Sequence, residues 1–279
     1  MSPQHQGRTV EPSESAKWET RTRSEFIEYY ARQSLSAASE KRSRELRDKL
    51  LKIHNDQGRK LNVADIGCNA GTQSRVWAEL GHRVYGVDIN EELVRLAHAR
   101  ITEAGLEGAF HIASATSLPF ADASMDVCIA PELLEHVADW RRCLEEFARI
   151  LRPGGVLYIS TTNRLCPVQH EYDLPLYSWY PASLKRRYEH LAVTTRPEIA
   201  NYATYPAVNW FTYYQLRDYL KGLNMECSDR FDNMKRGQNP LRRFALYAIQ
   251  LAPPIRWIAH VASPSTSVMA RKLSPRTPP

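Results

Sequence analysis

The sequence lacks the features that would mark a membrane-spanning or disulfide-stapled protein. No apolar run in its 279 residues is long enough to cross a bilayer, and the first twenty residues are polar, without the apolar core of a signal peptide. Cysteines are few, five in all and odd in number, and none forms a Cys-x-x-Cys pair. We therefore expect a protein of the reducing cytoplasm, with a disordered tail over residues 1–20.

Strand and helix patterns alternate through the middle of the chain. Apolar strands are predicted at 61–66, 83–88, 109–113, 125–130 and 155–161. Helices are predicted at 71–80, 91–104, 140–151 and 212–221, and two more strands at 225–231 and 267–272. This alternation predicts an α/β fold with a parallel sheet and right-handed crossovers.

The stretch from 63 to 90 carries the most informative pattern. An apolar strand ends in Asp65, a tight turn runs from Gly67 to Gly71, and a second strand ends in Asp88. Glycine lets the backbone approach a ligand closely, and Asn69 is of the residue type next most tolerant of a positive φ angle. Asp88 follows Gly71 by 17 residues, where a carboxylate can accept both hydroxyls of a ribose. The stretch is therefore the first βαβ unit of a nucleotide-type binding fold.

Two features favour a ligand with an ammonium group over a dinucleotide. The Gly67-x-Asn69-x-Gly71 spacing is tighter than Gly-x-Gly-x-x-Gly and has no third glycine to pack a pyrophosphate-binding helix. Asp65 precedes the turn, and an acid there suits an ammonium group better than a diphosphate. The alternative is a generic turn without a ligand, which rarely has an acid at the tip of the second strand.

Five motifs together resemble the class I S-adenosylmethionine-dependent methyltransferases over about residues 61–163. They are DIGCNAG, GVDIN, LPFADASMDVCIA, ELLEHV and ILRPGGVLYIST. The resemblance implies a Rossmann-like methyltransferase fold over 21–279, with a mostly parallel seven-stranded sheet whose last strand is antiparallel. It also implies N-terminal helices within 21–60, which often cover the cofactor cleft. Inserts are then expected after strand five, at 164–210, and between the last two strands, at 233–267.

The resemblance assigns residues to S-adenosylmethionine. Asp65, Gly67 and Gly71 would cradle its methionine part. Asp88 would hold the ribose, and Ile89 would pack against the adenine.

Further cofactor contacts are implied outside this unit. Ser114 stands where the family often has an acid for the adenine amino group, so a hydroxyl or the neighbouring backbone would have to substitute. In relatives an arginine upstream of the glycine turn contacts the cofactor carboxylate, and Arg47 is the ungapped candidate. The remaining expected contacts are Cys68, Asn69, Ala115 and Pro131.

Within the class, the nearest resemblance is to the ubiquinone-biosynthesis O-methyltransferases. It rests on ELLEHV, STTNR, a long insert and the helix WFTYYQLRDYL. His136 follows strand four and is the best candidate for a general base, with Glu132 and Glu135 beside it. In those relatives the matching residues are linked to a divalent metal, so ligation of Mg²⁺ or Zn²⁺ is a second alternative. A structural role in the turn is a third, and His170 and Glu171 are second-choice bases.

Residues 164–210 interrupt the alternation with a segment rich in proline and tyrosine. A long aromatic loop after strand five lies at the carboxyl edge of the sheet, where open α/β folds bind their ligands. We expect a lid over the substrate, because long ordered loops are usually functional. The alternative is a packed surface excursion.

The last fifty residues have a larger net positive charge than the whole chain. From residue 230 onward there are nine Lys or Arg and one acid, a balance of +8 against +6 for the whole chain. Apolar residues are interleaved, among them Phe244, Trp257 and Ile258, and Pro253-Pro254 should split the segment into two short helices. Residues 235–262 are therefore expected to bind an anionic membrane surface, with Arg236, Arg242, Arg243 and Arg256 as its cations. Packing on the sheet edge is the alternative, and nucleic acid is disfavoured because no RNA-binding module is evident.

These patterns predict O-methylation of a hydrophobic or membrane-associated small molecule, such as a phenol, a quinone precursor or a lipid-linked sugar. The protein would then be cytoplasmic and peripheral at the inner face of the membrane. Alternatives are a methyltransferase of a soluble natural product or sugar hydroxyl, and a non-catalytic cofactor-binding module. N-methylation of DNA is disfavoured, because Ala130-Pro131-Glu132-Leu133 stands where an Asn/Asp-Pro-Pro-aromatic motif would be. Nothing in the sequence sets an oligomeric state.

Overall fold

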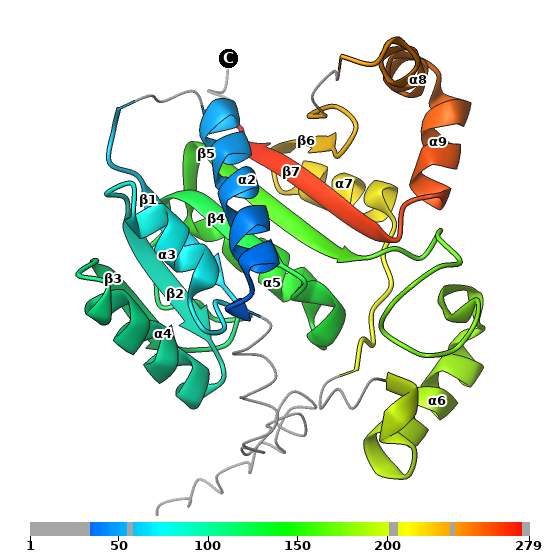
Figure 1. Ribbon diagram of the computed structural model, residues 1–279, viewed down its shortest axis with the longest axis horizontal. Coiled ribbons are helices and arrows are strands. Elements are labelled where there is room, and N and C mark those ends of the chain that lie inside the picture. The colour runs from blue at the N-terminus through cyan, green and yellow to red at the C-terminus, as the bar shows by residue number, and fades with distance from the viewer. Residues whose placement is uncertain (1–33, 55–57, 201–205, 235–237, 275–279) are drawn as a thin grey trace, which may run out of the picture.

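A seven-stranded sheet forms the centre of the computed structural model, which describes residues 34–54, 58–200, 206–234 and 238–274 (Figure 1). Its strand order is β3-β2-β1-β4-β5-β7-β6. The strands are β1 Asn62–Ile66, β2 Arg83–Asp88, β3 Gly108–Ile112, β4 Met125–Pro131, β5 Leu151–Thr162, β6 Met225–Asp229 and β7 Ser265–Lys272. The first five are parallel, and β7 pairs antiparallel with both β5 and β6. The predicted fold class is confirmed.

Helices cover both faces of this sheet (Figure 1). Those of the core are α2 Ala37–His54, α3 Thr72–Ala78, α4 Glu91–Glu103, α5 Trp140–Ile150 and α7 Tyr213–Gly222. Leu50 of α2 and Trp77 of α3 share one buried cluster, whereas Phe147 of α5 and Leu216 of α7 share another. Because both faces are covered, the central strand β4 is buried over almost its full length and its sequence is apolar rather than alternating.

Short polar side chains set the starts of these helices. Asn90 accepts hydrogen bonds from the backbone N–H groups of Glu92 and Leu93 at the start of α4. Asp139 and Thr212 cap α5 and α7 in the same way. Each cap satisfies N–H groups that the first turn of a helix leaves without a partner, and so fixes where the loop ends.

One boundary differs from the sequence prediction. The strand expected at 155–161 begins earlier, because β5 starts at Leu151, where Met125 pairs with Leu151 and Val127 with Val156. The extra residues on the β5 side therefore form a bulge, with Gly154 at a φ of 81°. At the other end of the chain, α2 falls within the predicted N-terminal helices. The predicted tail over 1–20 and the region up to residue 33 lie outside the described residues.

The insert after β5 has a small aromatic core of its own. It contains η3 Tyr177–Trp179, α6 Ala182–Thr194 and η4 Pro197–Ala200. Tyr172 stacks on Tyr177 with ring centroids 4.0 Å apart, and Tyr177 also meets the ring of Trp210 edge-on. The insert is therefore an ordered unit at the side of the sheet, as Figure 1 shows for α6.

The insert between β6 and β7 forms two helices, α8 Pro240–Leu251 and α9 Pro253–Val261. Asn239 caps α8, and the two prolines at 253 and 254 start α9, as the sequence predicts. The pair stands beyond the β6–β7 edge of the sheet (Figure 1). No helix in the described part of the chain is long and apolar enough to cross a membrane.

Candidate active site

The glycine turn lies where β1 ends beside β2. Gly67, Asn69 and Gly71 all have positive φ angles, of 74°, 49° and 75°. The N–H groups of Gly67 and Cys68 donate to the carbonyl oxygen of Val87, at 2.8 and 3.0 Å. These bonds hold the turn against the end of β2. The positive φ angles explain why the sequence places two glycines and an asparagine there.

Close packing holds the turn from the side of α4. A Cβ atom on Gly71 would lie 2.9 Å from the Cβ of Ala97, which real side chains do not tolerate. Cys68 is buried, and its sulfur would lie 3.1 Å from a Cβ on Gly86. Burial raises the pKa of the Cys68 thiol well above its ordinary value. The cysteine therefore fills the space behind the turn and is not a nucleophile.

Asp88 is positioned to bind a ribose. One of its oxygens accepts from the N–H of Asn69 at 3.0 Å, and the other accepts from the N–H of Asn90 at 2.9 Å. Each carboxylate oxygen has a second lone pair, so both can accept a sugar hydroxyl as well. The two backbone bonds fix the carboxylate at the tip of β2, next to the glycine turn.

Asp65 is fully buried at the end of β1. Its carboxylate accepts from the Ser74 hydroxyl at 2.6 Å, within α3. Burial raises the pKa of Asp65 to about 6, and the bonds from Ser74 oppose this rise only in part. A buried carboxyl of this kind becomes more acidic when a cation binds nearby. Such a group is compatible with a ligand that has an ammonium group, and the role of Asp65 in binding it stays a prediction.

An apolar surface lies beside Asp88. Ile89 is 56% exposed and Ile112 is 55% exposed, although both are large aliphatic residues. Ile112 pairs with Asp88 in the sheet, so the two isoleucines project from the carboxyl ends of adjacent strands. A flat aromatic ring would cover both. Ile112 is not among the contacts predicted from the sequence, although an apolar residue at the end of the third strand could have indicated it.

Three other expected contacts follow β3 or end β4. The Ser114 hydroxyl lies 2.8 Å from that of Thr116 and accepts from the Thr116 N–H at 3.2 Å, so it shapes its own turn. Ala115 is half-buried in the same turn. Pro131 ends β4, where it pairs with Ser160 of β5. These residues lie at the carboxyl edge of the sheet.

Arg47 has partners other than those expected. Its guanidinium donates to the carbonyl of Val76 at 2.7 Å and to Asp48 at 2.8 and 3.0 Å. Val76 lies in the second half of α3, past the end that meets the glycine turn. The prediction that Arg47 binds the cofactor carboxylate is therefore not supported. Ser34 is the N-terminal residue that lies near the turn. Its carbonyl accepts from the hydroxyl of Thr72, the residue directly after Gly71, at 2.8 Å.

The loop after β4 carries the expected catalytic residues. Glu132 is exposed, with a φ of 47°, and its N–H donates to the Ser160 carbonyl at 2.8 Å. Glu135 is fully buried and accepts from the Thr161 hydroxyl at 2.8 Å. Burial, followed by the charge of Glu132, raises the pKa of Glu135 well above its ordinary value. Burial therefore favours the neutral form of the Glu135 carboxyl. His136 follows it and is half-buried.

Glu171, in the insert after β5, is influenced by the charge of Glu132, as Glu135 is. Burial, with a further contribution from the negative charge of Glu132, raises the pKa of Glu171 to about 7. A carboxylate with this pKa can both accept and release a proton at neutral pH. The structure thus gives this second-choice base a protonation range that suits catalysis.

The metal-ligand set expected from the resemblance is not assembled. Within the described residues, no three His, Cys, Asp or Glu side chains are arranged to hold a metal ion.

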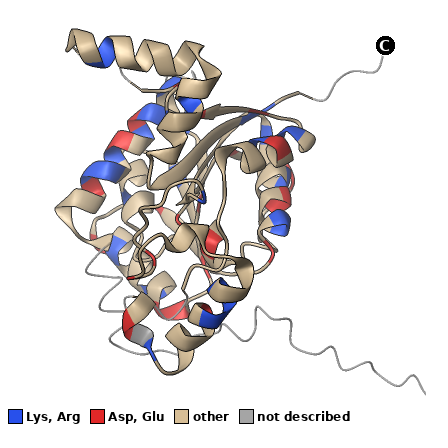
Figure 2. Cartoon of the chain, turned by 90° about the vertical axis from the view of Figure 1, so that its right-hand side faces the viewer, with Lys and Arg blue, Asp and Glu red and all other residues tan. Residues whose placement is uncertain are grey.

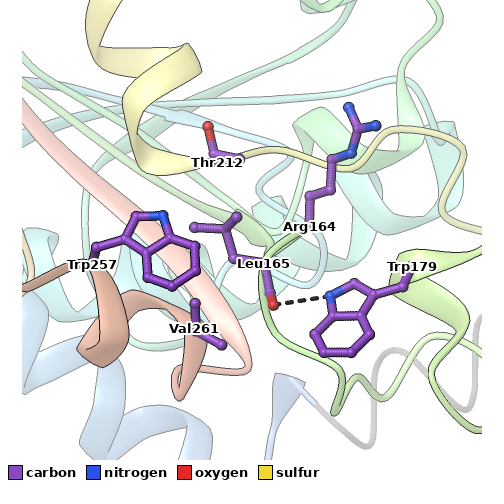
Figure 3. Close-up of a pocket in the computed structure, with 6 residues that line it drawn as sticks. All are labelled: Arg164, Leu165, Trp179, Thr212, Trp257 and Val261. Carbon is purple, nitrogen blue, oxygen red and sulfur yellow. Dashed lines mark hydrogen bonds between the residues drawn. The ribbon is translucent and has the colours of Figure 1, made fainter. Parts of the chain in front are cut away.

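An apolar cavity of about 470 Å³ lies between the insert after β5, the start of α7 and α9 (Figure 3). Three segments line it, with Arg164, Leu165 and Trp179 from the insert after β5, Thr212 from the start of α7, and Trp257 and Val261 from α9. The Trp179 indole donates to the Leu165 carbonyl at 3.0 Å and so fixes one wall (Figure 3). Sequence analysis did not anticipate a cavity shared by the two inserts.

Known proteins are similar to this chain over its cofactor-binding core. Residues 64–159 match a family described as a methyltransferase domain. Over 128 residues the chain is 36% identical to a ubiquinone biosynthesis O-methyltransferase of Caulobacter vibrioides, a match that covers 43% of this chain and 50% of that protein. A protein of the same name from Parvibaculum lavamentivorans is 36% identical over 104 residues, which are 37% of this chain and 41% of that one. The matched region spans half or less of these relatives.

The fold agrees with solved structures. An S-adenosylmethionine-dependent methyltransferase from Methanosarcina mazei superposes with a TM-score of 0.51 at 24% identity, covering 80% of this chain and 98% of that one. The structural likeness shows the fold, and the sequence matches show the kinship. The core of the chain is therefore a class I S-adenosylmethionine-dependent methyltransferase domain related to the ubiquinone biosynthesis O-methyltransferases.

Proposed function

We propose that the protein transfers a methyl group from S-adenosylmethionine to a hydroxyl of a hydrophobic small molecule, such as a phenol, a quinone precursor or a lipid-linked sugar. The observation that carries the methyl-transfer part is the glycine turn with Asp88 beside it, in a domain that matches methyltransferases. The hydroxyl as acceptor is supported by the name of the relatives, which are O-methyltransferases.

The cofactor fits the residues of the site. Asp88 offers two lone pairs to the ribose hydroxyls, and Ile89 and Ile112 offer an apolar surface to the adenine. The turn from Gly67 to Gly71 would receive the methionine part, with the negative charge of Asp65 behind it. When bound, S-adenosylmethionine supplies an electrophilic methyl group that needs no further activation.

The chain's own task is then to orient the acceptor and take its proton. A phenol with a pKa of about 10 is mostly neutral at pH 7, so it needs a base within hydrogen-bond reach. His136, on the loop after β4, is the first candidate, and Glu171 is the second because its pKa of about 7 matches the task. Holding the hydroxyl oxygen in line with the methyl group, near 3 Å, supplies much of the rate.

Two features support a hydrophobic acceptor. The cavity between the two inserts is apolar, and its lining residues Arg164 and Leu165 directly follow β5, the sheet neighbour of β4. The insert over 164–210 supplies both Glu171 and one wall of this cavity. It would thus act as a lid that positions an apolar chain on one side and the reacting hydroxyl on the other.

The test uses methyl-labelled cofactor with the full chain. Membrane and soluble extracts are incubated separately with wild type or His136→Ala, and labelled products are identified by mass spectrometry. The proposal expects label in an apolar product of the membrane extract, with at least about a hundredfold less from His136→Ala or a Glu171 variant. Label only in a water-soluble product would instead assign a soluble acceptor. Cofactor binding without any labelled product would indicate a cofactor-binding module.

A further inference from the structure

The two helices of the second insert expose an unusually apolar surface. Leu241 is 79% exposed and Phe244 is 72% exposed, while Leu246 is the only residue of α8 that is buried. The exposed face continues into α9, where Trp257 is half exposed. We call this surface the docking face, and its large members are Leu241, Phe244, Tyr247, Leu251, Ile255, Trp257 and Ile258.

Helical periodicity gathers these residues on one side of α8. Leu241, Phe244, Tyr247 and Leu251 recur at spacings of three and four, which places them along one stripe. Exposed apolar residues scattered singly are ordinary, but a contiguous stripe of this size marks an interaction surface. Tryptophan and tyrosine within it are the residue types that prefer the boundary between an apolar phase and water.

The charge beside the docking face has one sign. Neither α8 nor α9 contains an acidic residue, and α8, across the top of Figure 2, is drawn without acidic colour. Arg242 and Arg243 are both exposed on α8, and Arg243 lies next to the apolar stripe by helical periodicity. Apolar area with basic neighbours and no acids is complementary to an anionic bilayer.

The fourth expected cation, Arg256, does not belong to this surface. Its guanidinium lies 2.8 Å from Asp229 and 2.5 Å from Asp232, which end and follow β6. His260 adds a contact of 2.9 Å to the same Asp229 oxygen. The prediction that Arg256 contacts lipid is therefore wrong, because two acids distant in sequence compensate its charge. Arg236 lies outside the described residues.

This ion-pair cluster fixes the docking face relative to the core. Besides Arg256 and His260, Gln250 of α8 donates to the Phe231 carbonyl at 2.8 Å. Asn163, at the end of β5, donates to the carbonyls of His260 and Ser263 at 2.8 and 2.7 Å. The helices are thus tied to the edge of the sheet beside the candidate active site. A surface that contacts α9 would be held in one orientation to that site.

We propose that the docking face binds the surface of an anionic lipid bilayer. The apolar stripe inserts shallowly, because α8 has 12 residues and a helix of that length spans about 18 Å against about 30 Å of hydrocarbon. Arg242 and Arg243 contact the headgroups. Trp257 belongs to both the docking face and the lining of the apolar cavity (Figure 3), so the cavity opens next to the bilayer. Delivery of a lipid-soluble acceptor to this cavity rests on the proposed function. Binding of the docking face to the bilayer does not.

The test is co-sedimentation of the full chain with vesicles. Wild type should bind vesicles of phosphatidylcholine mixed with phosphatidylglycerol and should not bind pure phosphatidylcholine. Arg242→Glu with Arg243→Glu should weaken binding by at least roughly 30-fold, because each arginine loses the attraction of the anionic surface. The matched control is Lys41→Glu with Arg42→Glu, two exposed neighbours on α2. This control should bind vesicles almost as wild type does.

A second pair of variants tests the apolar contribution. Phe244→Ser should reduce vesicle binding, whereas Leu80→Ser, at a half-exposed leucine outside the docking face, should not. Every variant should keep wild-type affinity for S-adenosylhomocysteine, which shows that its core is folded. The proposal is overturned if wild type stays unbound at low salt, or if the Arg242 and Arg243 variant binds as tightly as its control. It is also overturned if light scattering shows a dimer that Phe244→Ser dissociates, since a second copy would then cover this face.

Discussion

Gly71 is a position where both the backbone conformation and the packing against α4 require glycine. Gly71 and Gly81 have nearly the same backbone conformation, with φ of 75° and 79°. An added Cβ on Gly81 would meet nothing within 4 Å, whereas on Gly71 it would lie 2.9 Å from the Cβ and 3.2 Å from the Cα of Ala97. The alanine variants at these two positions therefore separate backbone strain from the contact between the turn and α4.

The expected magnitudes follow from these two terms. A left-handed conformation costs an alanine about 1–2 kcal/mol, so Gly81→Ala should lose that much free energy of unfolding. Gly71→Ala bears the same cost and must also push α4 away from the turn, which adds about 1–3 kcal/mol of overpacking. Because the shift moves the backbone around Asn69, Gly71→Ala should also bind cofactor more weakly, whereas Gly81→Ala should bind it as wild type does.

Urea unfolding followed by circular dichroism measures the first quantity, and calorimetric titration with S-adenosylhomocysteine measures the second. Wild type and both variants are compared under identical conditions. If the two variants lose equal stability and both retain full affinity, then α4 does not hold the turn at Gly71 and the packing argument is refuted.

Three further predictions concern titratable groups. If Glu171 is the base, wild-type turnover should rise with pH through about 7, and Glu171→Gln should abolish that limb in a pH–rate profile while cofactor affinity persists. If His136 is the base, His136→Ala should lose at least about a hundredfold in turnover with unchanged cofactor affinity, and wild-type activity in His136→Ala would exclude that role. Asp65 keeps its proton in the folded protein up to about pH 6, so the free energy of unfolding without ligand should fall as pH rises from about 4 to 6, by up to about 3 kcal/mol. Asp65→Asn should flatten this slope in urea titrations, and an unchanged slope would show that another group causes it.

The parts of the site that follow from local sequence were predictable. Strand ends, turn residues and their spacing place Gly67, Gly71 and Asp88 together, because parallel strands share one carboxyl edge. The double proline likewise fixes the division between α8 and α9. In these cases the pattern and the structure depend on the same short stretch of chain.

The partners of long side chains were not predictable in this way. Arg47 donates to Val76, 29 residues away, and Arg256 pairs with Asp229, 27 residues away. Both arginines stand in basic stretches that indicate exposure, but tertiary neighbours determine what a flexible guanidinium contacts. The burial of Glu135 was not predictable either. It packs against Thr161 because β4 pairs with β5, and the motif ELLEHV alone does not indicate this contact.

Calorimetric titration of S-adenosylhomocysteine into wild type and Asp88→Asn tests the central claim, that the turn and Asp88 form the cofactor site. Asparagine keeps the size of the side chain but removes the charge that strengthens bonds to the ribose hydroxyls. Affinity should therefore fall by at least about 1.5 kcal/mol, roughly tenfold. Glu107→Gln, at a fully exposed carboxylate outside the site, is the matched control and should bind as wild type does. Absence of binding by wild type, or equal affinity of wild type and Asp88→Asn, would contradict the account.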